Sequence, residues 1–560
     1  MAAASAAASQ RPSPMSSEGR AAEDVVVETE YGRVRGVREV VLGRAVTAFY
    51  GIPFARPPVK SLRFRPPEPI GPWAPQVYDC TSKKVFQVCP QFPNKEGSLN
   101  YGREDCLYLN IYVPSENPIL NQSSFAVFFW IYGGGFVFGD KDEFGWYDGK
   151  NLAASRNVVV VEPNYRLGAL GFLGLKALFA EEGTTGNYGV QDQQLALKFA
   201  HRNIRAFGGD PSRIMIAGES AGAMSVCWHV VSELSQPYFS TALMESGSCS
   251  TSVFFVEMER AEVFSREVGA KVGCNPGLPD VEFTRCLREV DFKAFFMQPE
   301  SWPVPIPGTN HSIVPPLFAT MPFGITMDGT TRGLRALPLE TLRKPTFPLK
   351  PLLIGSNKDE GTIFKGVIAR SVPNVTLPLD DAGVRLVLRH FFNETTTNDV
   401  LQEYEGIGDN DRKYELVIRD FMFLCPSVFA ADALASRNDP VYLYQFDMDL
   451  PNWLDWDALG DYHTIELSFV FDNEWPPVVH DFGEREKEMA AGLGLLWTNF
   501  ARFGDPSSGG GAPISWPRYT TAKKEYLELD IPFRVSNTLM GQVCDFWRHR
   551  DAKWSDPVVA

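Results

Sequence analysis

The sequence lacks the features that mark several large functional classes. It has no run of four or more consecutive Lys or Arg residues, and its formal net charge is −15. Binding to nucleic-acid phosphates needs clustered positive charge, so no nucleic-acid partner is expected. No apolar stretch reaches about 18 residues, so no membrane span is predicted. No two of the nine cysteines form a Cys-x-x-Cys pair, so neither a metal site nor a dithiol redox motif is predicted.

What is present is the composition of a packed globular protein. The chain has 560 residues, of which 44% are apolar and 22% are charged. Residues 1–24 are rich in Ala and Ser and are predicted to form a disordered leader. Residues 25–555 have an even texture without a dividing linker, and they are predicted to form one large domain.

The sequence gives conflicting indications about the compartment. The leader has no charged start followed by a long apolar core, so it is a poor secretory signal. Four glycosylation acceptors of the type Asn-x-Ser/Thr begin at Asn121, Asn310, Asn374 and Asn393. These acceptors favour secretion or the lumen of the secretory pathway, and an organelle or the cytoplasm stay open as alternatives.

Two apolar runs indicate the fold class. The run Phe125–Ile131 leads into three glycines at 133–135, and the run Arg213–Ala217 leads into Gly218–Gly222. Continuously apolar strands are typical of a sheet that is buried on both faces. A helical pattern at 192–201 lies between the two runs, and strands that alternate with helices predict an α/β fold with parallel strands.

The motif Gly218-x-Ser220-x-Gly222 predicts a nucleophilic serine. An apolar strand precedes it and a proline-free helical pattern follows it, which is the context of a nucleophile elbow. The alternative interpretation is an ordinary turn between glycines. The three glycines at 133–135 favour a loop whose N–H groups stabilise an oxyanion, and a plain flexible turn is the alternative there.

A serine nucleophile also needs a base and an orienting acid, in the chain order Ser, Asp or Glu, His. Four of the seven histidines lie far enough downstream, namely those at 390, 463, 480 and 549. His463 is favoured because it lies in a turn-like segment next to an apolar run, and catalytic side chains are common in such loops.

Taken together, these motifs resemble the type-B carboxylesterase/cholinesterase family of α/β hydrolases, from about residue 27 to about residue 550. The resemblance implies an α/β-hydrolase fold. The segments that carry it are AFYGIPFARPP (48–58), EDCLYLNIYVP (104–114), WIYGGGF (130–136), NYRLGALGFL (164–173), FGGDPSRIMIAGESAGA (207–223), GSNKDEGT (355–362) and HTIELSFVF (463–471).

The resemblance implies a role for each residue that matches the family's motifs. Ser220 corresponds to the nucleophile, Glu360 to the orienting acid and His463 to the general base. The implied oxyanion-hole donors are the backbone N–H groups of Gly134, Gly135 and Ala221. Glu219 and Glu466 correspond to acids that line the active site outside the triad. Two structural ion pairs are also implied, between Arg63 and Glu104 and between Arg166 and Asp192.

The resemblance further implies three disulfides, Cys89–Cys106, Cys274–Cys286 and Cys425–Cys544. Their presence would favour the secretory pathway. The three remaining cysteines, Cys80, Cys227 and Cys249, are interpreted as free thiols with a structural role.

Three positions depart from the cholinesterase pattern and bear on the substrate. The short loop Pro90–Asp105 contains no Trp, whereas cholinesterases place there a Trp that binds the choline cation. Val137 and Ile363 stand where cholinesterases tend to have aromatic residues. A general carboxylesterase is therefore predicted, acting on a small-molecule ester through an acyl-enzyme without a cofactor. A catalytically inactive adhesion module and a lipase-like enzyme are the alternatives, and the oligomeric state is not predicted.

A fourth departure concerns the backbone beside the predicted base. Thr464 stands where the family usually has a Gly after the catalytic histidine. A β-branched residue does not easily adopt a positive φ, so the backbone is expected to be either ordinary or distorted at this point.

Overall fold

A computed structural model describes most of the chain. The described residues are 24–83, 87–91, 102–115, 125–250, 254–296, 304–305, 312–313, 323–348, 350–372, 374–389, 391–448, 459–474, 482–538 and 542–551. Residues 1–23 of the predicted leader lie outside these ranges, as do most of the loop 90–105, the acceptors Asn121 and Asn310, and the histidines at 390 and 480. The domain boundaries at 25 and 555 stay a prediction.

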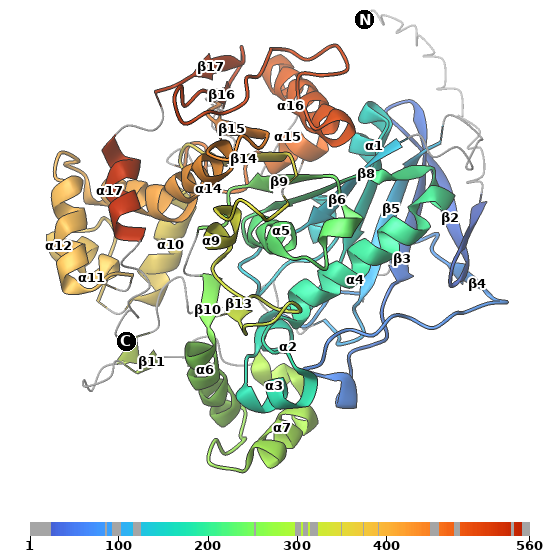
Figure 1. Ribbon diagram of the computed structural model, residues 1–560, viewed down its shortest axis with the longest axis horizontal. Coiled ribbons are helices and arrows are strands. Elements are labelled where there is room, and N and C mark those ends of the chain that lie inside the picture. The colour runs from blue at the N-terminus through green and yellow to red at the C-terminus, as the bar shows by residue number, and fades with distance from the viewer. Residues whose placement is uncertain are drawn as a thin grey trace, which may run out of the picture.

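One large sheet organises the molecule (Figure 1). In the described part of the chain it has 13 strands. Its order is β1-β2-β3-β5-β7-β6-β8-β9-β14-β15-β16-β17, and β4 pairs with β2. The strands are β1 Asp24–Thr29, β2 Gly32–Val41, β3 Arg44–Pro53, β4 Val77–Asp79, β5 Tyr108–Pro114, β6 Phe125–Ile131, β7 Val159–Pro163, β8 Gly209–Glu219, β9 Thr241–Glu245, β14 Leu352–Asn357, β15 Val441–Phe446, β16 Tyr526–Leu529 and β17 Arg534–Ser536. Two small sheets pair β10 Phe255–Glu257 with β13 Ile325–Met327, and β11 Val304–Pro305 with β12 Ser312–Ile313.

The central strands from β7 to β16 run parallel, and antiparallel strands form both edges. The apolar run predicted at 125–131 is β6, and the run at 213–217 lies within β8. All of β14, all of β6 after Phe125 and the last six residues of β8 are buried, because helices cover the sheet. The predicted α/β-hydrolase architecture, with a large and mostly parallel sheet flanked by helices, is confirmed.

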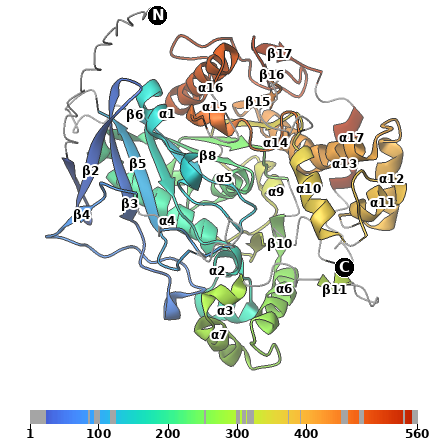
Figure 2. The same ribbon diagram turned by 180° about the vertical axis from the view of Figure 1, so that it is seen from behind.

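Two groups of helices pack on the central strands. The helices α4 and α5 contact each other and β8, and they lie in front of the sheet in Figure 1 and behind it in Figure 2. The helices α1, α15 and α16 form the second group. The helix bounds are α1 Lys150–Arg156, α2 Gly168–Phe172, α3 Lys176–Glu182, α4 Tyr188–Asn203, α5 Ala221–Val231, α6 Met258–Lys271, α7 Asp280–Glu289, α9 Pro338–Leu342, α10 Thr362–Ser371, α11 Asp381–Leu388, α12 Glu394–Glu403, α13 Asn410–Ile418, α14 Cys425–Ala435, α15 Leu467–Phe471, α16 Glu484–Phe503 and α17 Gln542–Asp551.

The strand register places the predicted site residues at one edge of the sheet. Ile131 of β6 pairs with Gly218 of β8, and Glu219 pairs with Glu245 of β9. Glu245 pairs in turn with Gly355 of β14. This edge is the one formed by the carboxyl ends of the parallel strands. Because these strands all point the same way, the segments that follow β6, β8, β9 and β14 meet there. Within the described ranges, no helix is both long and apolar enough to cross a membrane.

Candidate active site

Ser220 lies on a sharp turn between a strand and a helix. Its φ is 55° and its ψ is −123°, between the end of β8 and the start of α5. A Cβ on Gly222 would lie 2.0 Å from the Ile131 carbonyl oxygen, and a Cβ on Gly218 would lie 2.6 Å from the carbonyl carbon of Gly222. Side chains at these two positions would therefore prevent the strand and helix from approaching, which explains the glycines on either side of the strained serine.

The glycine loop after β6 lies directly beside this turn. A Cβ on Gly133 would lie 3.1 Å from Ser220 Cβ and 2.7 Å from Glu219 Oε2. Gly134 and Gly135 follow with φ values of 88° and 58°, which a residue with a side chain rarely adopts. The glycines therefore serve both the close approach to Ser220 and the reversal of the loop.

His463 and Glu360 are 103 residues apart in sequence and in contact in the structure. His463 Nδ1 lies 2.6 Å from Glu360 Oε2, at hydrogen-bond distance. The second oxygen, Glu360 Oε1, accepts a hydrogen bond of 2.8 Å from the Asn357 backbone N–H. The exposed fraction is 0% for Glu360 and 6% for His463, so this contact is shielded from water.

The opposite side of the His463 ring faces the turn that holds Ser220. His463 Nε2 lies 3.1 Å from Oε1 of Glu219, the residue just before Ser220. The exposed fraction of Ser220 is 9%. Within the described part of the chain, no hydrogen bond joins Ser220 to His463. Contacts of this kind are often long without substrate and shorten when substrate binds.

The aromatic rings around His463 fix its plane. The ring centroid of Phe423 lies 4.7 Å from that of His463, and the centroid of Phe364 lies 5.3 Å away. Phe423 belongs to the π-helix η8 Arg419–Leu424, which leads into α14, and Phe364 belongs to α10. Thr464, the next residue, has a φ of 84°, so the backbone beside the histidine is distorted, which was one of the two expectations.

Three buried glutamates beside Glu360 share an acidic environment. Burial raises the pKa of Glu219 well above its ordinary value, and repulsion from Glu466, Glu360 and Glu245 adds to this effect. Burial, with repulsion from Glu360, raises the pKa of Glu466 to about 7. Burial, with repulsion from Glu466, also raises the pKa of Glu245. Protonation of some of these groups near neutral pH limits the negative charge around His463.

The sequence motifs did not single out several residues of this environment. Asn357 connects two of the buried glutamates. Its backbone N–H donates to Glu360 Oε1, and its side-chain Nδ2 donates to Glu466 Oε2 over 2.5 Å. Glu245 accepts a hydrogen bond of 2.7 Å from Trp497 Nε1. Asn357 and Glu245 are the last residues of β14 and β9, so their place at strand ends could have indicated them.

The two ion pairs implied by the resemblance are present; Arg166–Asp192 is buried and Arg63–Glu104 is partly buried. Arg166 binds Asp192 through two side-chain contacts of 2.7 Å each, and its backbone N–H donates to the same carboxylate. Arg63 binds Glu104 at 2.6 Å and also donates to the carbonyl oxygens of Leu287 and Val290, in the segment at the end of α7. Both pairs connect separate elements, and neither contacts Ser220.

The disulfides correct one sequence prediction. The pairs Cys89–Cys106, Cys274–Cys286 and Cys425–Cys544 are joined. The interpretation of Cys227 and Cys249 as free thiols is wrong, because they form a fourth disulfide. Cys227 lies on α5 and Cys249 lies just after β9, and packing of α5 over β8 and β9 brings their Cα atoms within 5.3 Å. Cys80 is buried and belongs to none of the four pairs.

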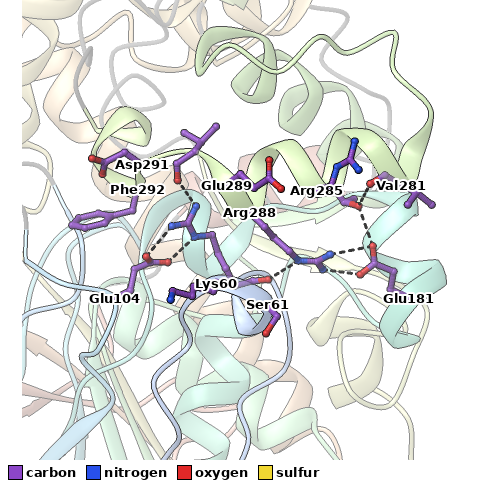
Figure 3. A pocket seen from close by; sticks show the side chains of 13 residues that line it. Lys60, Ser61, Glu104, Glu181, Val281, Arg285, Arg288, Glu289, Asp291 and Phe292 are labelled. Atoms are coloured by element: carbon purple, nitrogen blue, oxygen red, sulfur yellow. Dashed lines mark hydrogen bonds and ion pairs between the residues drawn. The ribbon is translucent and has the colours of Figure 1, made fainter.

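A surface cavity of about 880 Å³ lies elsewhere, between α7 and the short helix Lys60–Leu62 (Figure 3). Its walls include the Arg63–Glu104 pair and the pair between Arg288 and Glu181, at 2.7 Å. None of the site residues discussed above, apart from this structural ion pair, lines it. Opposite charges in these walls neutralise one another, so the cavity offers no strong field for a charged ligand.

Comparison with known proteins agrees with this geometry. The sequence model described as "Carboxylesterase family" matches residues 23–547. The chain is 34% identical to an acetylcholinesterase of Bungarus fasciatus over 554 residues, which cover 95% of this chain and 87% of the relative. It is also 34% identical to a cholinesterase of Mus musculus over 555 residues, 94% of this chain and 87% of the relative. The chain therefore belongs to the carboxylesterase family and is a carboxylic-ester hydrolase.

Proposed function

We propose that the protein hydrolyses carboxylic esters through an acyl-enzyme on Ser220, with His463 as the general base and Glu360 as the orienting acid. The observation that carries this proposal is the position of the His463 ring. Its Nδ1 contacts the buried Glu360, and its Nε2 faces the turn that holds Ser220. An acid that contacts one nitrogen of an imidazole whose other nitrogen faces a serine turn supports acyl transfer by these three residues.

In the first step, Ser220 Oγ attacks the ester carbonyl carbon and its proton passes to His463 Nε2. Glu360 accepts a hydrogen bond from His463 Nδ1–H. This hydrogen bond selects the tautomer in which Nε2 carries no proton, and the carboxylate stabilises the imidazolium that forms. His463 then protonates the leaving alcohol. In the second step, a water molecule attacks the acyl carbonyl carbon while His463 takes its proton. The bond between the acyl group and Ser220 Oγ then breaks, and His463 returns the proton to Oγ as the acid leaves.

The tetrahedral intermediate carries a negative oxygen that needs hydrogen-bond donors. Gly134, Gly135 and Ala221 supply backbone N–H groups for this purpose in our proposal. Support comes from the contact of the glycine loop with Ser220 and from the place of Ala221 at the first position of α5. Loss of one such donor typically costs about 10²–10³ in rate. Glu219 and Glu466 line the site in this proposal, and burial raises the pKa of both carboxyl groups.

The proposed substrate class is that of general small-molecule esters, although the relatives are named as cholinesterases. Val137 is buried next to the glycine loop, and Ile363 is half-buried on α10 beside Phe364. These aliphatic side chains offer no π-face to a quaternary ammonium group. The sequence of the loop at 90–105 contains no Trp that could supply such a π-face instead.

Four disulfides support a place in the secretory pathway, because such bonds persist in oxidising compartments. Glycosylation at the Asn-x-Ser/Thr acceptors is part of this proposal. Asn393 caps α12 with its side chain and lies on the surface, where a glycan has room.

The Ser220→Ala variant tests the proposed nucleophile. We expect it to lose hydrolysis of p-nitrophenyl acetate while its circular dichroism and Tm stay near those of the parent. The matched control is Ser212→Ala, which removes an exposed hydroxyl from the same strand and should keep full activity. Unchanged turnover in Ser220→Ala would reject the assignment.

Two further assays separate the alternatives. A fluorophosphonate probe should label the purified protein at Ser220, whereas an adhesion module would stay unlabelled. A series of acetyl, butyryl, long-chain and choline esters should give the highest kcat/KM for short, uncharged esters. A preference for long acyl chains would indicate a lipase-like enzyme, and a preference for choline esters would contradict the proposed substrate class.

A further inference from the structure

The five residues Ser246–Ser250, which we name the β9 loop, are unusually buried for a connecting segment. Every residue of the loop is buried, and it leaves the end of β9 at the sheet edge where the proposed catalytic residues meet. Buried loops are uncommon because their polar groups need partners. The partners of this loop are the informative feature, since they lie on both sides of the proposed active site.

On one side the β9 loop contacts the nucleophile turn. The Ser220 backbone N–H donates to the carbonyl oxygen of Glu245, the residue just before the loop, at 2.9 Å. A Cβ on Gly247 would lie 2.5 Å from the Ser220 carbonyl oxygen and 2.8 Å from Ala223 Cβ. The loop backbone thus packs directly against the first turn of α5.

On the other side the loop contacts the elements that hold His463. Ser246 Oγ donates to Oε1 of Glu466, on the segment that carries the histidine, at 3.3 Å. Ser248 Oγ and Ser250 Oγ both donate to the carbonyl oxygen of Pro426, at 2.7 and 2.9 Å. Pro426 lies at the start of α14, directly after the π-helix whose Phe423 packs on the His463 ring.

The Cys227–Cys249 disulfide completes this arrangement. Cys249 lies between Ser248 and Ser250, and its partner Cys227 lies on α5, about two turns after Ser220. Both cysteines are buried. The loop is therefore hydrogen-bonded to the histidine side and covalently joined to the nucleophile helix.

We propose that the Cys227–Cys249 disulfide is a positioning cross-link, which holds the β9 loop against α5 and so fixes Ser220 relative to His463. This inference rests on the proposed roles of those two residues. A disulfide that only stabilised the fold would lower the free energy of unfolding when removed, and the folded enzyme would keep its reactivity. A positioning cross-link also changes the reactivity of the folded enzyme, because a displacement of about 1 Å can cost about 10² in rate.

The test compares a Cys227→Ala/Cys249→Ala variant with the parent enzyme. We expect the rate constant for inactivation by a fluorophosphonate, and kcat for p-nitrophenyl acetate, to fall by about 10–100-fold. The KM should change by less than about threefold, because the cross-link does not touch the substrate. All rates are measured at a temperature where circular dichroism shows every variant to be folded.

The matched control is Cys274→Ala/Cys286→Ala. This pair spans 12 residues and the tested pair spans 22, so the two disulfides restrict the unfolded chain to a similar degree. The control pair connects the end of α6 to α7, outside the proposed site. It should lose stability and keep its fluorophosphonate reactivity.

Two more variants complete the test. Cys227→Val/Cys249→Ala refills volume without restoring the bond, so it should stay slow; recovery of the parent rate would show that packing, and not the cross-link, is responsible. Ser248→Ala/Ser250→Ala keeps the bond but releases the loop from Pro426. It should lower kcat without raising KM, and it provides the test if the cysteine variants do not fold.

Parent reactivity in a folded Cys227→Ala/Cys249→Ala variant would overturn the inference, as would parent kcat in the serine variant. Failure of the proposed function gives a different result, because the parent enzyme itself would then not react with the fluorophosphonate at Ser220.

Discussion

Replacing Glu360 by Gln changes one carboxylate oxygen into an amide nitrogen and leaves the shape of the side chain intact. Both Glu360 oxygens accept hydrogen bonds, one at 2.6 Å from His463 Nδ1 and one at 2.8 Å from the Asn357 N–H. An amide has one oxygen, so it cannot accept both. Either the His463 tautomer reverses or a buried N–H loses its partner.

The expected fall in kcat has a second cause, which is the loss of the negative charge of Glu360. In the proposed mechanism, removal of the carboxylate takes away the buried anion that stabilises the developing imidazolium. The corresponding Asp-to-Asn change in a serine protease lowers kcat by about 10⁴. For Glu360→Gln we expect a fall in kcat of about 10³–10⁴, which corresponds to about 4–5.5 kcal/mol in the activation free energy.

Stopped-flow measurement of p-nitrophenyl acetate hydrolysis, with Tm measured in parallel, checks this prediction. The control is Glu415→Gln, a nearby buried carboxylate that binds Lys365 at 2.9 Å and does not contact His463. It should retain kcat within about threefold. A kcat for folded Glu360→Gln equal to that of the control would refute the role of Glu360.

Three further changes have expected outcomes. Arg166→Met leaves the Asp192 carboxylate buried without its cation, so urea titrations should show a free energy of unfolding lower by about 3–5 kcal/mol. The control Arg202→Met removes an exposed cation and should change this free energy little. Equal effects of the two substitutions would contradict the role of the buried pair. Burial lowers the pKa of His229 from 6.5 to about 3, so the unfolded chain binds a proton that the folded chain does not, and stability should fall as the pH decreases from 6.5 towards 3. In His229→Gln this part of the pH dependence, on the order of 4 kcal/mol, should be absent, and an unchanged slope would show that His229 is not its source. Thr464→Gly removes the backbone strain of a β-branched residue at a φ of 84°, so it should raise the free energy of unfolding by about 1 kcal/mol and raise Tm with it. A lower Tm would show that contacts of the threonine side chain stabilise the fold by more than the strain destabilises it.

The sequence alone was sufficient for the α/β class, for two central strands of the sheet and for the turn that holds Ser220. The strand at 125–131 and the Gly-x-Ser-x-Gly turn are local patterns, since apolar runs and glycines reflect burial and close backbone approach nearby. Pairing Glu360 with His463 needed the family resemblance, because no local pattern connects residues that are 103 positions apart.

The fourth disulfide was missed for a related reason. Cys227 and Cys249 were left over after the family's pairs had been assigned, and their contact depends on the packing of α5 over β9. Counting residues along the chain does not reveal that Cys249 lies at the sheet edge beside the first turns of α5. The buried residues Glu219 and Glu245 were likewise brought together by strand register and not by sequence proximity.

A rapid-quench experiment decides whether Ser220 carries the acyl group. The enzyme is mixed with p-nitrophenyl acetate, quenched in acid within the first turnover, digested, and its peptides are weighed by mass spectrometry. We expect the mass of a single acetyl group on the peptide that contains Ser220, appearing with the burst of p-nitrophenol and disappearing as turnover ends. An acetyl group on another residue, or a burst without acetylation of Ser220, would contradict the proposed mechanism.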